Sequence, residues 1–304
     1  EKPLLDEIEA LFEVYRNTED EAERAALYHK IDSVSYLASG YAIPNEYDKL
    51  MSVIGADGTN AYTSTDMTVY VEDIPSNQIE NWARIEADRF MHPVIRGFHT
   101  ELETVYEEKN MSLTNDFRKS LEAMDGILFA DHPYGTQTVL GTQEHLKNPS
   151  VTNIKNYHKT YYVPNNMAIC LSGDFDPDEM VSIIEKYFGQ MEPNKELPQL
   201  KLETKSVIET PQEKDVYGLD AETLMMGWKY PGAGTDEALV ASVVSYILYN
   251  GSAGLIDLNL IQQQKVLGAQ AMPYTRPDAG EFLIIAHPKQ GQTLDQVKDL
   301  VLDN

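Results

Sequence analysis

The acidic stretch Thr100-Glu-Leu-Glu-Thr-Val-Tyr-Glu-Glu-Lys-Asn110 is the most concentrated group of carboxylates in the sequence. Glu101 and Glu108 are seven residues apart. In a helix with about 100° per residue they therefore lie within roughly 20° of each other. One helical face presents two carboxylates, one above the other. They could take part in chemistry, or they could belong to a solvated face that only keeps the protein soluble.

The histidines do not form a recognisable metal site. No pair has the spacing His-x-x-x-His or His-x-x-Glu-His on a predicted helix, and isolated histidines are mostly surface or core groups. The sequence also lacks a Gly-x-Ser-x-Gly elbow and a phosphate-binding Gly-x-x-x-x-Gly-Lys loop. Motifs alone therefore indicate no obvious enzyme class. The seven histidines are His29, His92, His99, His132, His145, His158 and His287.

Composition narrows the classes of partner and site. The net charge is −25, from 24 Lys and Arg against 49 Asp and Glu, so we expect no nucleic-acid binding. Cys170 is the one cysteine of the chain, which excludes an intrachain disulfide and argues against a thiolate metal site. No apolar run approaches the roughly 20 residues needed for a transmembrane helix. An acidic cavity that attracts basic peptides is a weaker interpretation of the charge than simple solubility.

The elements expected in the first half alternate between helices and a short strand region. Apolar spacing predicts a helical hairpin over residues 3–30, with a break at Asn17-Thr18 and Thr18 as N-cap of the second helix. Further helices are predicted over 44–54, 76–91 with Ser76 as N-cap, 99–124 and 150–161. A strand is predicted over 59–70, and His132 to Gly135 reads as a turn.

The second half restarts the same kind of pattern. An apolar strand is predicted over 166–173, with Cys170 buried in it, followed by a helix from Asp176-Pro177 to about Gly189. Residues 192–214 contain three prolines and little periodicity, which indicates a linker. Strands over 224–230, 269–274 and 281–287 and helices over 236–249, 255–264 and from 294 follow. The length of 304 residues and this interleaving favour a two-domain α+β protein.

An ordered set of motifs resembles the pitrilysin (insulinase) family of zinc metallopeptidases. The match covers roughly residues 44–190, and the second half, with Gly251-Ser252 between helices, resembles the start of a further homologous domain. The matching motifs are Gly58-Thr-Asn-Ala-Tyr-Thr-Ser64, Thr68-Val-Tyr70, Ile74-Pro75, Glu86-Ala-Asp-Arg-Phe90, the Glu-rich helix, His132-Pro-Tyr-Gly135 with Gly141, and Tyr162-x-Pro-Asn-Asn-Met167 leading to Gly173-Asp174.

The resemblance implies roles for particular residues. The family binds zinc through an inverted His-x-x-Glu-His helix and a distal glutamate, which here corresponds to Glu108. Glu101 corresponds to an auxiliary acid near the metal. Asn60, Ala61 and Tyr62 correspond to an edge strand that pairs with extended peptide substrates, and Glu108 is expected to face that strand. In the family the metal activates a water molecule for attack on the scissile carbonyl.

The resemblance fails at the histidine helix. The corresponding stretch, His29-Lys-Ile-Asp-Ser33, keeps one histidine but has Asp32 and Ser33 where the family has a glutamate and a second histidine. Either residues 1–40 are an insertion and the zinc motif lies upstream of Glu1, or the protein is a non-catalytic relative. In both cases we expect the 304-residue chain to bind zinc poorly and to cleave nothing, because one carboxylate cannot replace three ligands.

The resulting expectation is an α+β fold of two homologous-type α/β sandwich units, each with an antiparallel-rich sheet packed with helices. The first unit would lack its N-terminal strand and zinc-motif helix. The expected segments are a helical hairpin insertion (1–40), an incomplete peptidase-type domain (41–191), a linker (192–214) and the start of a second domain (215–304). The expected function is that of a piece of a zinc endopeptidase. The alternative is a peptide-binding or assembly subunit.

Expected partners are a peptide substrate and further homologous domains or a partner subunit. The resemblance to the family favours a secreted, periplasmic or cell-envelope location. The sequence itself does not indicate the compartment.

Overall fold

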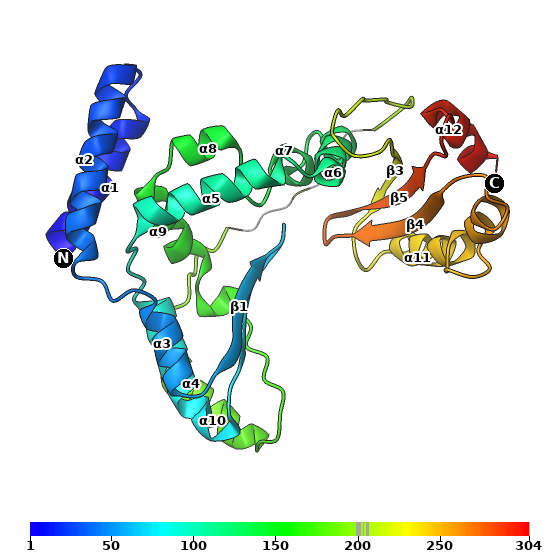
Figure 1. Cartoon of the computed structure of the whole chain (residues 1–304). Helices are drawn as coiled ribbons and strands as arrows, with labels where there is room; N and C mark the ends of the chain where they lie inside the picture. Colours follow the sequence, from blue (N-terminus) through cyan, green and yellow to red (C-terminus); the bar gives the residue numbers. More distant parts are fainter. Residues whose placement is uncertain (199–201, 203, 205–206, 304) are drawn as a thin grey trace. The chain divides into compact units, whose positions relative to one another are not determined.

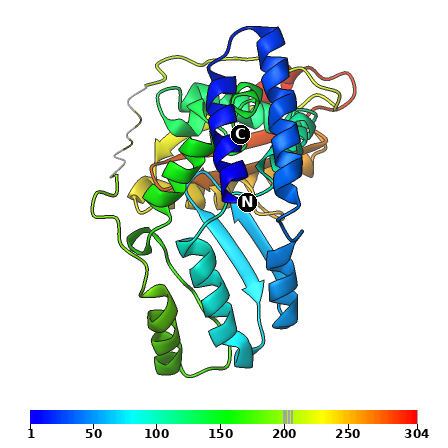
Figure 2. The same cartoon turned by 90° about the vertical axis from the view of Figure 1, so that its left-hand side faces the viewer.

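The computed structural model describes residues 1–198, 202, 204 and 207–303 as an α+β protein with antiparallel sheets packed against helices (Figures 1 and 2). The chain divides into two compact units. Unit 1 contains Glu1–Glu108 and Gly141–Gln199, and unit 2 contains Lys109–Leu140 and Leu200–Asn304. Each unit is described separately below.

Unit 1 begins with a helical hairpin, in which α1 (Lys2–Arg16) and α2 (Glu21–Ser39) lie side by side (Figures 1 and 2). Phe12 and Ile31 are fully buried between the helices. The predicted N-cap, Thr18, is wrong. Its hydroxyl donates to the Val14 carbonyl at 2.9 Å and so belongs to the end of α1, whereas Asp20 caps α2 by accepting from the Glu23 amide at 2.8 Å. The second helix also continues past the predicted end at residue 30.

The predicted strand over 59–70 is an antiparallel hairpin of two strands, β1 (Asp57–Thr63) and β2 (Thr68–Asp73). The strands separate because Ser64 and Met67 close a tight turn, with the Ser64 amide 2.8 Å from the Met67 carbonyl oxygen. The turn contains neither glycine nor proline, the residues that usually indicate a turn in a sequence.

Three helices pack beside this hairpin: α3 (Glu46–Val53) contacts β1, and α4 (Ile79–Met91) packs against α10 (Pro177–Phe188). The shared core contains Met51, Trp82, Ala83 and Phe188. The predicted helices 44–54 and 176–189 are confirmed. Ser76 does not cap α4, because it starts the short 3-10 helix η1 (Ser76–Gln78) that precedes it.

The helix predicted over 99–124 is interrupted. It forms α5 (Phe98–Ser112) and α6 (Asp116–Leu128). Asn115 has an extended backbone, and its side chain accepts from the Arg118 amide at 2.8 Å, which starts a new helix. Three short elements follow, namely α7 (Pro133–Thr136), α8 (Gln143–Lys147) and η2 (Pro164–Asn166). The predicted helix 150–161 is confirmed as α9 (Val151–Tyr161), with Ser150 as N-cap.

The strand predicted over 166–173 does not form, and Cys170 is exposed rather than buried. Apolar content alone does not make a strand, because a strand needs a neighbour to accept its backbone hydrogen bonds. In the described part of unit 1 the sheet consists of β1 and β2 alone, and neither pairs with this segment.

Unit 2 contains a three-stranded antiparallel sheet in the order β3-β5-β4, formed by β3 (Leu224–Pro231), β4 (Gly268–Thr275) and β5 (Ala279–His287). Alternate side chains of β5 face α11 (Asp236–Leu248), η3 (Asp257–Ile261) and α12 (Leu294–Leu302). The three predicted strands and the first and last predicted helices are confirmed. The expected helix 255–264 is mostly the single π-helical turn η3. The predicted linker, 192–214, has no helix or strand in its described residues and partly lies outside them.

Candidate functional site

The outer edge of β1 is the part of unit 1 that is open to an extended ligand. In the described part of the chain β1 pairs with β2 alone, so one of its two edges faces no strand. Asn60, Ala61 and Tyr62 are all exposed, and Tyr62 retains 57% of its accessible surface. The three residues predicted to bind a peptide therefore lie together on an exposed edge strand.

The backbone of Ala61 points away from β2. Its amide donates to the Asn60 side-chain oxygen at 2.8 Å rather than to β2. Because N–H and C=O groups alternate in direction along an antiparallel strand, Asn60 and Tyr62 direct theirs toward their partners Val71 and Val69. Ala61 thus offers one donor and one acceptor outward, and an added strand would displace the Asn60 side chain from that donor.

Buried polar contacts fix the hairpin onto the helices. Glu72 of β2 accepts from the Trp82 indole at 3.0 Å and lies 2.8 Å from the Tyr47 hydroxyl. That hydroxyl is also 2.7 Å from Glu86, but it has one proton to donate. Burial raises the pKa of Glu86, although Arg89 beside it acts in the opposite direction. Arg89 donates to Glu86 at 2.6 Å, and together these contacts position β1 through β2.

The two carboxylates predicted to lie near a metal, Glu101 and Glu108, are both exposed side chains of α5. Neither side chain forms a hydrogen bond or ion pair with another described residue. No contact supports the expectation that Glu108 faces the Asn60–Tyr62 strand. Its role as a metal ligand therefore stays a prediction. On the same helix Glu103 accepts from the Tyr28 hydroxyl, and Lys109 is buried.

The stretch His29-Lys-Ile-Asp-Ser33 lies within α2 and carries no metal-binding arrangement. His29 is exposed, and the Ser33 hydroxyl donates to the His29 carbonyl at 2.8 Å. Asp32 lies 3.6 Å from Nε2 of His99, on a different helix. Among the described residues, no group of three or more His, Cys, Asp or Glu could hold a metal ion. The donor set does not fit a zinc ion, which needs three protein ligands at a catalytic site.

A buried charged cluster in unit 2 escaped the sequence analysis. Arg276 donates to Asp125 at 2.9 Å and to the fully buried Glu281 at 3.4 Å. Its guanidinium group lies 4.5 Å from the ring centre of Phe129 and 4.3 Å from that of Tyr134. Burial, and then the charge of Asp125, raise the pKa of Glu281 to about 7 despite Arg276. The cluster joins α6 to the β4–β5 hairpin.

His132 stands next to this cluster and is almost completely buried. Its Nδ1 accepts from the Tyr134 amide at 3.1 Å, so in the neutral ring the proton is on Nε2, which lies 3.6 Å from Asp278. The motif His132-Pro-Tyr-Gly135 is therefore more than a turn, because its side chains hold the end of α6 against the β4–β5 connection. The motif was the one sequence signal for this cluster.

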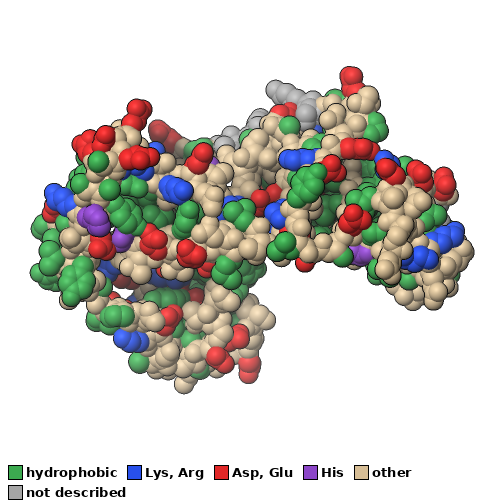
Figure 3. Space-filling view, turned by 45° about the horizontal axis from the view of Figure 1, so that its top comes forward, with side chains coloured by type: hydrophobic (Ala, Val, Ile, Leu, Met, Phe, Trp, Pro, Cys, Tyr) green, Lys and Arg blue, Asp and Glu red, His purple; other side chains and the backbone are tan. Residues whose placement is uncertain are grey.

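On the face drawn in Figure 3, acidic side chains are scattered, with apolar side chains between them, and they do not gather at one site. The described helices include none that is both long and apolar enough to cross a membrane.

Comparison with known proteins identifies the family. Residues 150–304 match the model described as the peptidase M16 inactive domain. The chain belongs to the M16 peptidase family. This confirms the resemblance to the pitrilysin and insulinase peptidases, and the matched M16 region includes all of the sheet of unit 2.

Among M16 relatives, the zinc protease PqqE of Helicobacter pylori is 22% identical over 293 residues, which are 92% of this chain and 64% of that protein. Bovine (Bos taurus) insulin-degrading enzyme is 26% identical over 206 residues, which are 64% of this chain and 20% of the enzyme. The chain thus spans less than two thirds of the length of these M16 relatives.

Solved M16 structures share the fold. A protease from Helicobacter pylori has a TM-score of 0.72 at 20% identity, covering 84% of this chain and 64% of that one. A putative M16-like peptidase from Alicyclobacillus acidocaldarius has a TM-score of 0.67 at 19% identity, covering 86% and 63% respectively. These likenesses support the M16-like α+β architecture.

Proposed function

We propose that this chain is a non-catalytic, peptide-binding part of an M16 peptidase assembly, and that it holds an extended polypeptide along β1. The observation that carries the proposal is the outward-facing backbone of Ala61 on an exposed edge strand. Two further findings support the non-catalytic part. Half of the chain matches the inactive M16 domain, and the described residues bring no set of metal-ligating side chains together.

An edge strand suits a protein that accepts many peptides. Main-chain hydrogen bonds supply affinity that does not depend on the peptide's side chains. Pockets for every second side chain supply the specificity. On β1 the exposed Tyr62 side chain provides apolar contact beside the peptide backbone. The ligand class is therefore an extended, unfolded segment rather than a folded domain.

The test is binding of a fluorescein-labelled ten-residue extended peptide, measured by anisotropy. The matched control is the same peptide with alternate backbone nitrogens methylated, which keeps the side chains but removes the donors and hinders pairing. We expect the methylated peptide to bind at least about fivefold more weakly, since the hydrogen bond to the Ala61 carbonyl, of about 1 kcal/mol, is lost and the methyl groups hinder pairing.

Ala61→Pro supplies the matching change on the protein. Proline is tolerated on an edge where the N–H faces outward, so we expect the melting temperature to stay within a few degrees while peptide binding is lost. Equal binding of both peptides, or full binding by the Ala61→Pro variant, would exclude β1 as the site.

A second candidate function is that of the substrate-holding part of a zinc endopeptidase in which Glu108 completes a metal site. Its support is that PqqE and other relatives are named zinc proteases, and that Glu108 is exposed and so available to histidines from elsewhere. Glu101 is then the auxiliary acid.

Calorimetric titration of zinc into the 304-residue chain tests whether it contains a complete metal site of its own. For the 304-residue chain we expect no stoichiometric binding and no cleavage of an unstructured peptide, and Glu108→Gln should change neither. Tight zinc binding that Glu108→Gln abolishes would instead favour the peptidase.

The repeat organisation supports an assembly of related domains. Each unit contains an antiparallel hairpin followed by a helix, β1–β2–α4 in unit 1 and β4–β5–α12 in unit 2. We infer that residues 41–191 and 215–304 are related domains, with residues 1–40 as an insertion and 192–214 as the linker. Further homologous domains or a partner subunit are the expected partners.

A further inference from the structure

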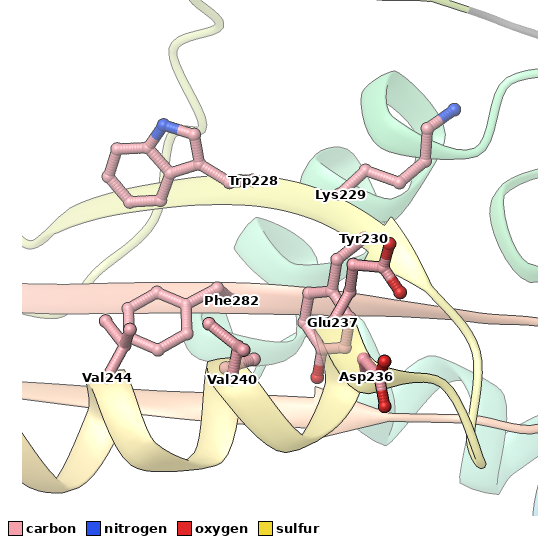
Figure 4. Close-up of a pocket in the computed structure, with 9 residues that line it drawn as sticks. Trp228, Lys229, Tyr230, Asp236, Glu237, Val240, Val244 and Phe282 are labelled. Carbon is pink, nitrogen blue, oxygen red and sulfur yellow. The ribbon is translucent and has the colours of Figure 1, made fainter.

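The sheet of unit 2 is covered on both of its faces. On one face Phe282 of β5 lies beside Val240 and Val244 of α11 (Figure 4). Because side chains alternate along a strand, Glu281, the residue before Phe282, points to the other face. Glu281 is nonetheless fully buried, so a second element must cover that face of the sheet.

Helix α6 is the element that covers this second face. Gly227 of β3 lies on it, directly opposite Leu283, and a Cβ added at Gly227 would be 2.7 Å from Sδ of Met124 on α6. The helix therefore packs against bare backbone, an approach that glycine permits. Residues 109–140, with α6 and α7, belong to unit 2, although unit 1 resumes at Gly141. Contacts that are distant in the sequence must hold these residues, here called the α6–α7 segment, on the sheet.

The α6–α7 segment is attached near both ends of α6. At the beginning of the helix Asp116 accepts from two backbone amides of the chain that precedes β3. Lys119 and these amides lower the pKa of Asp116, so this attachment keeps its charge between pH 5 and pH 8. Near the end of the helix Asp125 accepts from Arg276, which also donates to Glu281. The second attachment is buried and depends on three ionisable side chains.

One oxygen of Glu281 lacks a hydrogen-bond donor. Oε1 accepts from Arg276 at 3.4 Å, whereas Oε2 is buried and has no hydrogen-bond partner among the described residues. Burial, then the charge of Asp125 and a hydrogen bond between the two carboxyl groups, raise the pKa of Glu281 despite Arg276. Two ionised carboxylates cannot hydrogen-bond to each other, because their oxygens only accept. A proton on Oε2 of Glu281 supplies the missing donor.

We propose that Glu281 and Asp125 form a binding site for one shared proton, and that this proton latches the end of the α6–α7 segment onto β5. The proton is bonded to Oε2 of Glu281 and donated to the Asp125 carboxylate. With it, the charges of Glu281, Asp125 and Arg276 sum to zero. When the proton leaves for solvent at higher pH, two buried carboxylates face one guanidinium group. The end of α6 and α7 then separate from β5, while the first turn of α6 stays attached.

The groups around the pair do not make the proton unnecessary. None of the described neighbours donates to Oε2 of Glu281, and the charge of Glu122 raises the pKa of Asp125 further. His132 is neutral, because its Nδ1 accepts from a backbone amide. The proton site does not rest on the proposed peptide site at β1, which lies in the other unit. The titratable and charged groups that face the pair are Glu122 on α6, His132 and Tyr134 at α7, Lys229 and Tyr230 on β3, and Tyr274, Arg276 and Asp278 on the β4–β5 hairpin.

Difference infrared spectroscopy tests for the proton directly. At pH 6 ordinary Asp and Glu side chains are ionised, so the spectrum of the wild type minus that of Glu281→Gln should contain one protonated-carboxyl band. With a pKa of about 7 for Glu281, the band should shrink about tenfold by pH 8. Glu222→Gln, an exposed change in the same unit, is the matched control and should leave the band in place.

Hydrogen exchange followed by mass spectrometry tests the latch. Proteins are compared at one pH at a time, because the intrinsic exchange rate depends on pH. The side chain of Glu281→Gln donates to Asp125 and accepts from Arg276 without an added proton. At pH 8 the amides of residues 125–136 should therefore exchange at least about tenfold faster in the wild type than in this variant, and at pH 5 they should exchange alike. Amides of α12, on the other face of the sheet, should differ less.

Asp125→Asn tests whether the proton is shared. Its amide donates to the Glu281 carboxylate and its oxygen accepts from Arg276, so at pH 8 the same amides should exchange as slowly as in Glu281→Gln. Circular dichroism at pH 5 checks that both variants fold.

Three results would overturn the proposal. One is a difference spectrum without the protonated-carboxyl band at pH 6. Another is fast exchange at pH 8 that persists in Asp125→Asn, which would show that Glu281 binds its proton alone. The third is an equal change in the α12 amides, which would show that the proton stabilises unit 2 as a whole and latches no particular segment. Failure of the β1 experiment leaves all three readouts unaffected.

Discussion

At the scale of single residues, the cluster around Arg276 places one buried guanidinium group between two carboxylates. Glu281 is fully buried and Asp125 is close to it, and one guanidinium group serves both carboxylates. Burial raises the pKa of Asp125 as well as that of Glu281. Two buried carboxylates sharing one cation retain a proton more readily than either would in water.

This predicts that unit 2 loses stability as the pH rises. The folded-state pKa of Glu281 is raised from 4.5 to about 7, so protonation favours the folded state. The stabilising effect is complete below pH 4.5 and is lost as the pH passes through about 7. Between pH 5 and pH 8 we expect the free energy of unfolding to fall by about 2 kcal/mol from this group. Urea denaturation at several pH values, followed by Trp228 fluorescence, measures it.

Glu281→Gln mimics the protonated carboxyl group and should flatten that pH dependence. The charged and titratable groups that remain beside position 281 are Asp125, Arg276 and Tyr230. The exposed Glu222→Gln, also in unit 2, should leave the slope unchanged. A Glu281→Gln variant with the wild-type slope would show that another group carries the pH dependence.

Apart from the neighbouring His132-Pro-Tyr-Gly135 motif, the sequence did not indicate the cluster, because Asp125 lies on α6, Arg276 in the β4–β5 turn and Glu281 on β5, up to 156 residues apart. The edge strand could be foreseen. Asn60, Ala61 and Tyr62 belong to one continuous motif whose order along the chain resembles a known family, and their exposure follows from being on an edge. The position of Glu108 near a metal depends on residues from elsewhere, so neither the motif nor the structure establishes it.

At the scale of elements, local signals decided which predictions succeeded. The helix at α10 was predictable because Asp176 accepts from two amides and Pro177 occupies the first helical position. The break between α5 and α6 was missed because it depends on one asparagine in a polar run. The strand over 166–173 was wrong because a strand is a property of a pair, and the described unit supplies no partner.

The break between α5 and α6 gives a prediction that separates the two interpretations. If Asn115 caps α6, Asn115→Ala should lower the free energy of unfolding by about 1 kcal/mol. In an uninterrupted helix the same change should raise stability, because alanine is the better helix former. Thermal melting by circular dichroism decides the sign. Glu107→Ala, an exposed change within α5, is the control and should shift the transition by at most about 0.5 kcal/mol.

At the scale of the whole molecule, the chain consists of two units with separate hydrophobic cores. Phe12 is fully buried in the core of α1 and α2, and Leu260 is fully buried against the sheet of unit 2. Separate cores allow separate unfolding transitions. The peptide edge at β1 can therefore be tested in unit 1 while the folding of each unit is monitored by its own tryptophan.

We expect Leu260→Ala to destabilise unit 2 by about 3 kcal/mol and to leave unit 1 near its wild-type stability, because the lost packing lies in one core. Phe12→Ala should do the reverse. Trp82 is the tryptophan of unit 1 and Trp228 that of unit 2, so Trp82→Phe and Trp228→Phe backgrounds each report one unit during urea denaturation. If Leu260→Ala moves the midpoint equally in both backgrounds, the units unfold as one cooperative body. In that case the peptide edge at β1 would have to be tested as part of the whole chain, because a change in either unit would alter the stability of both.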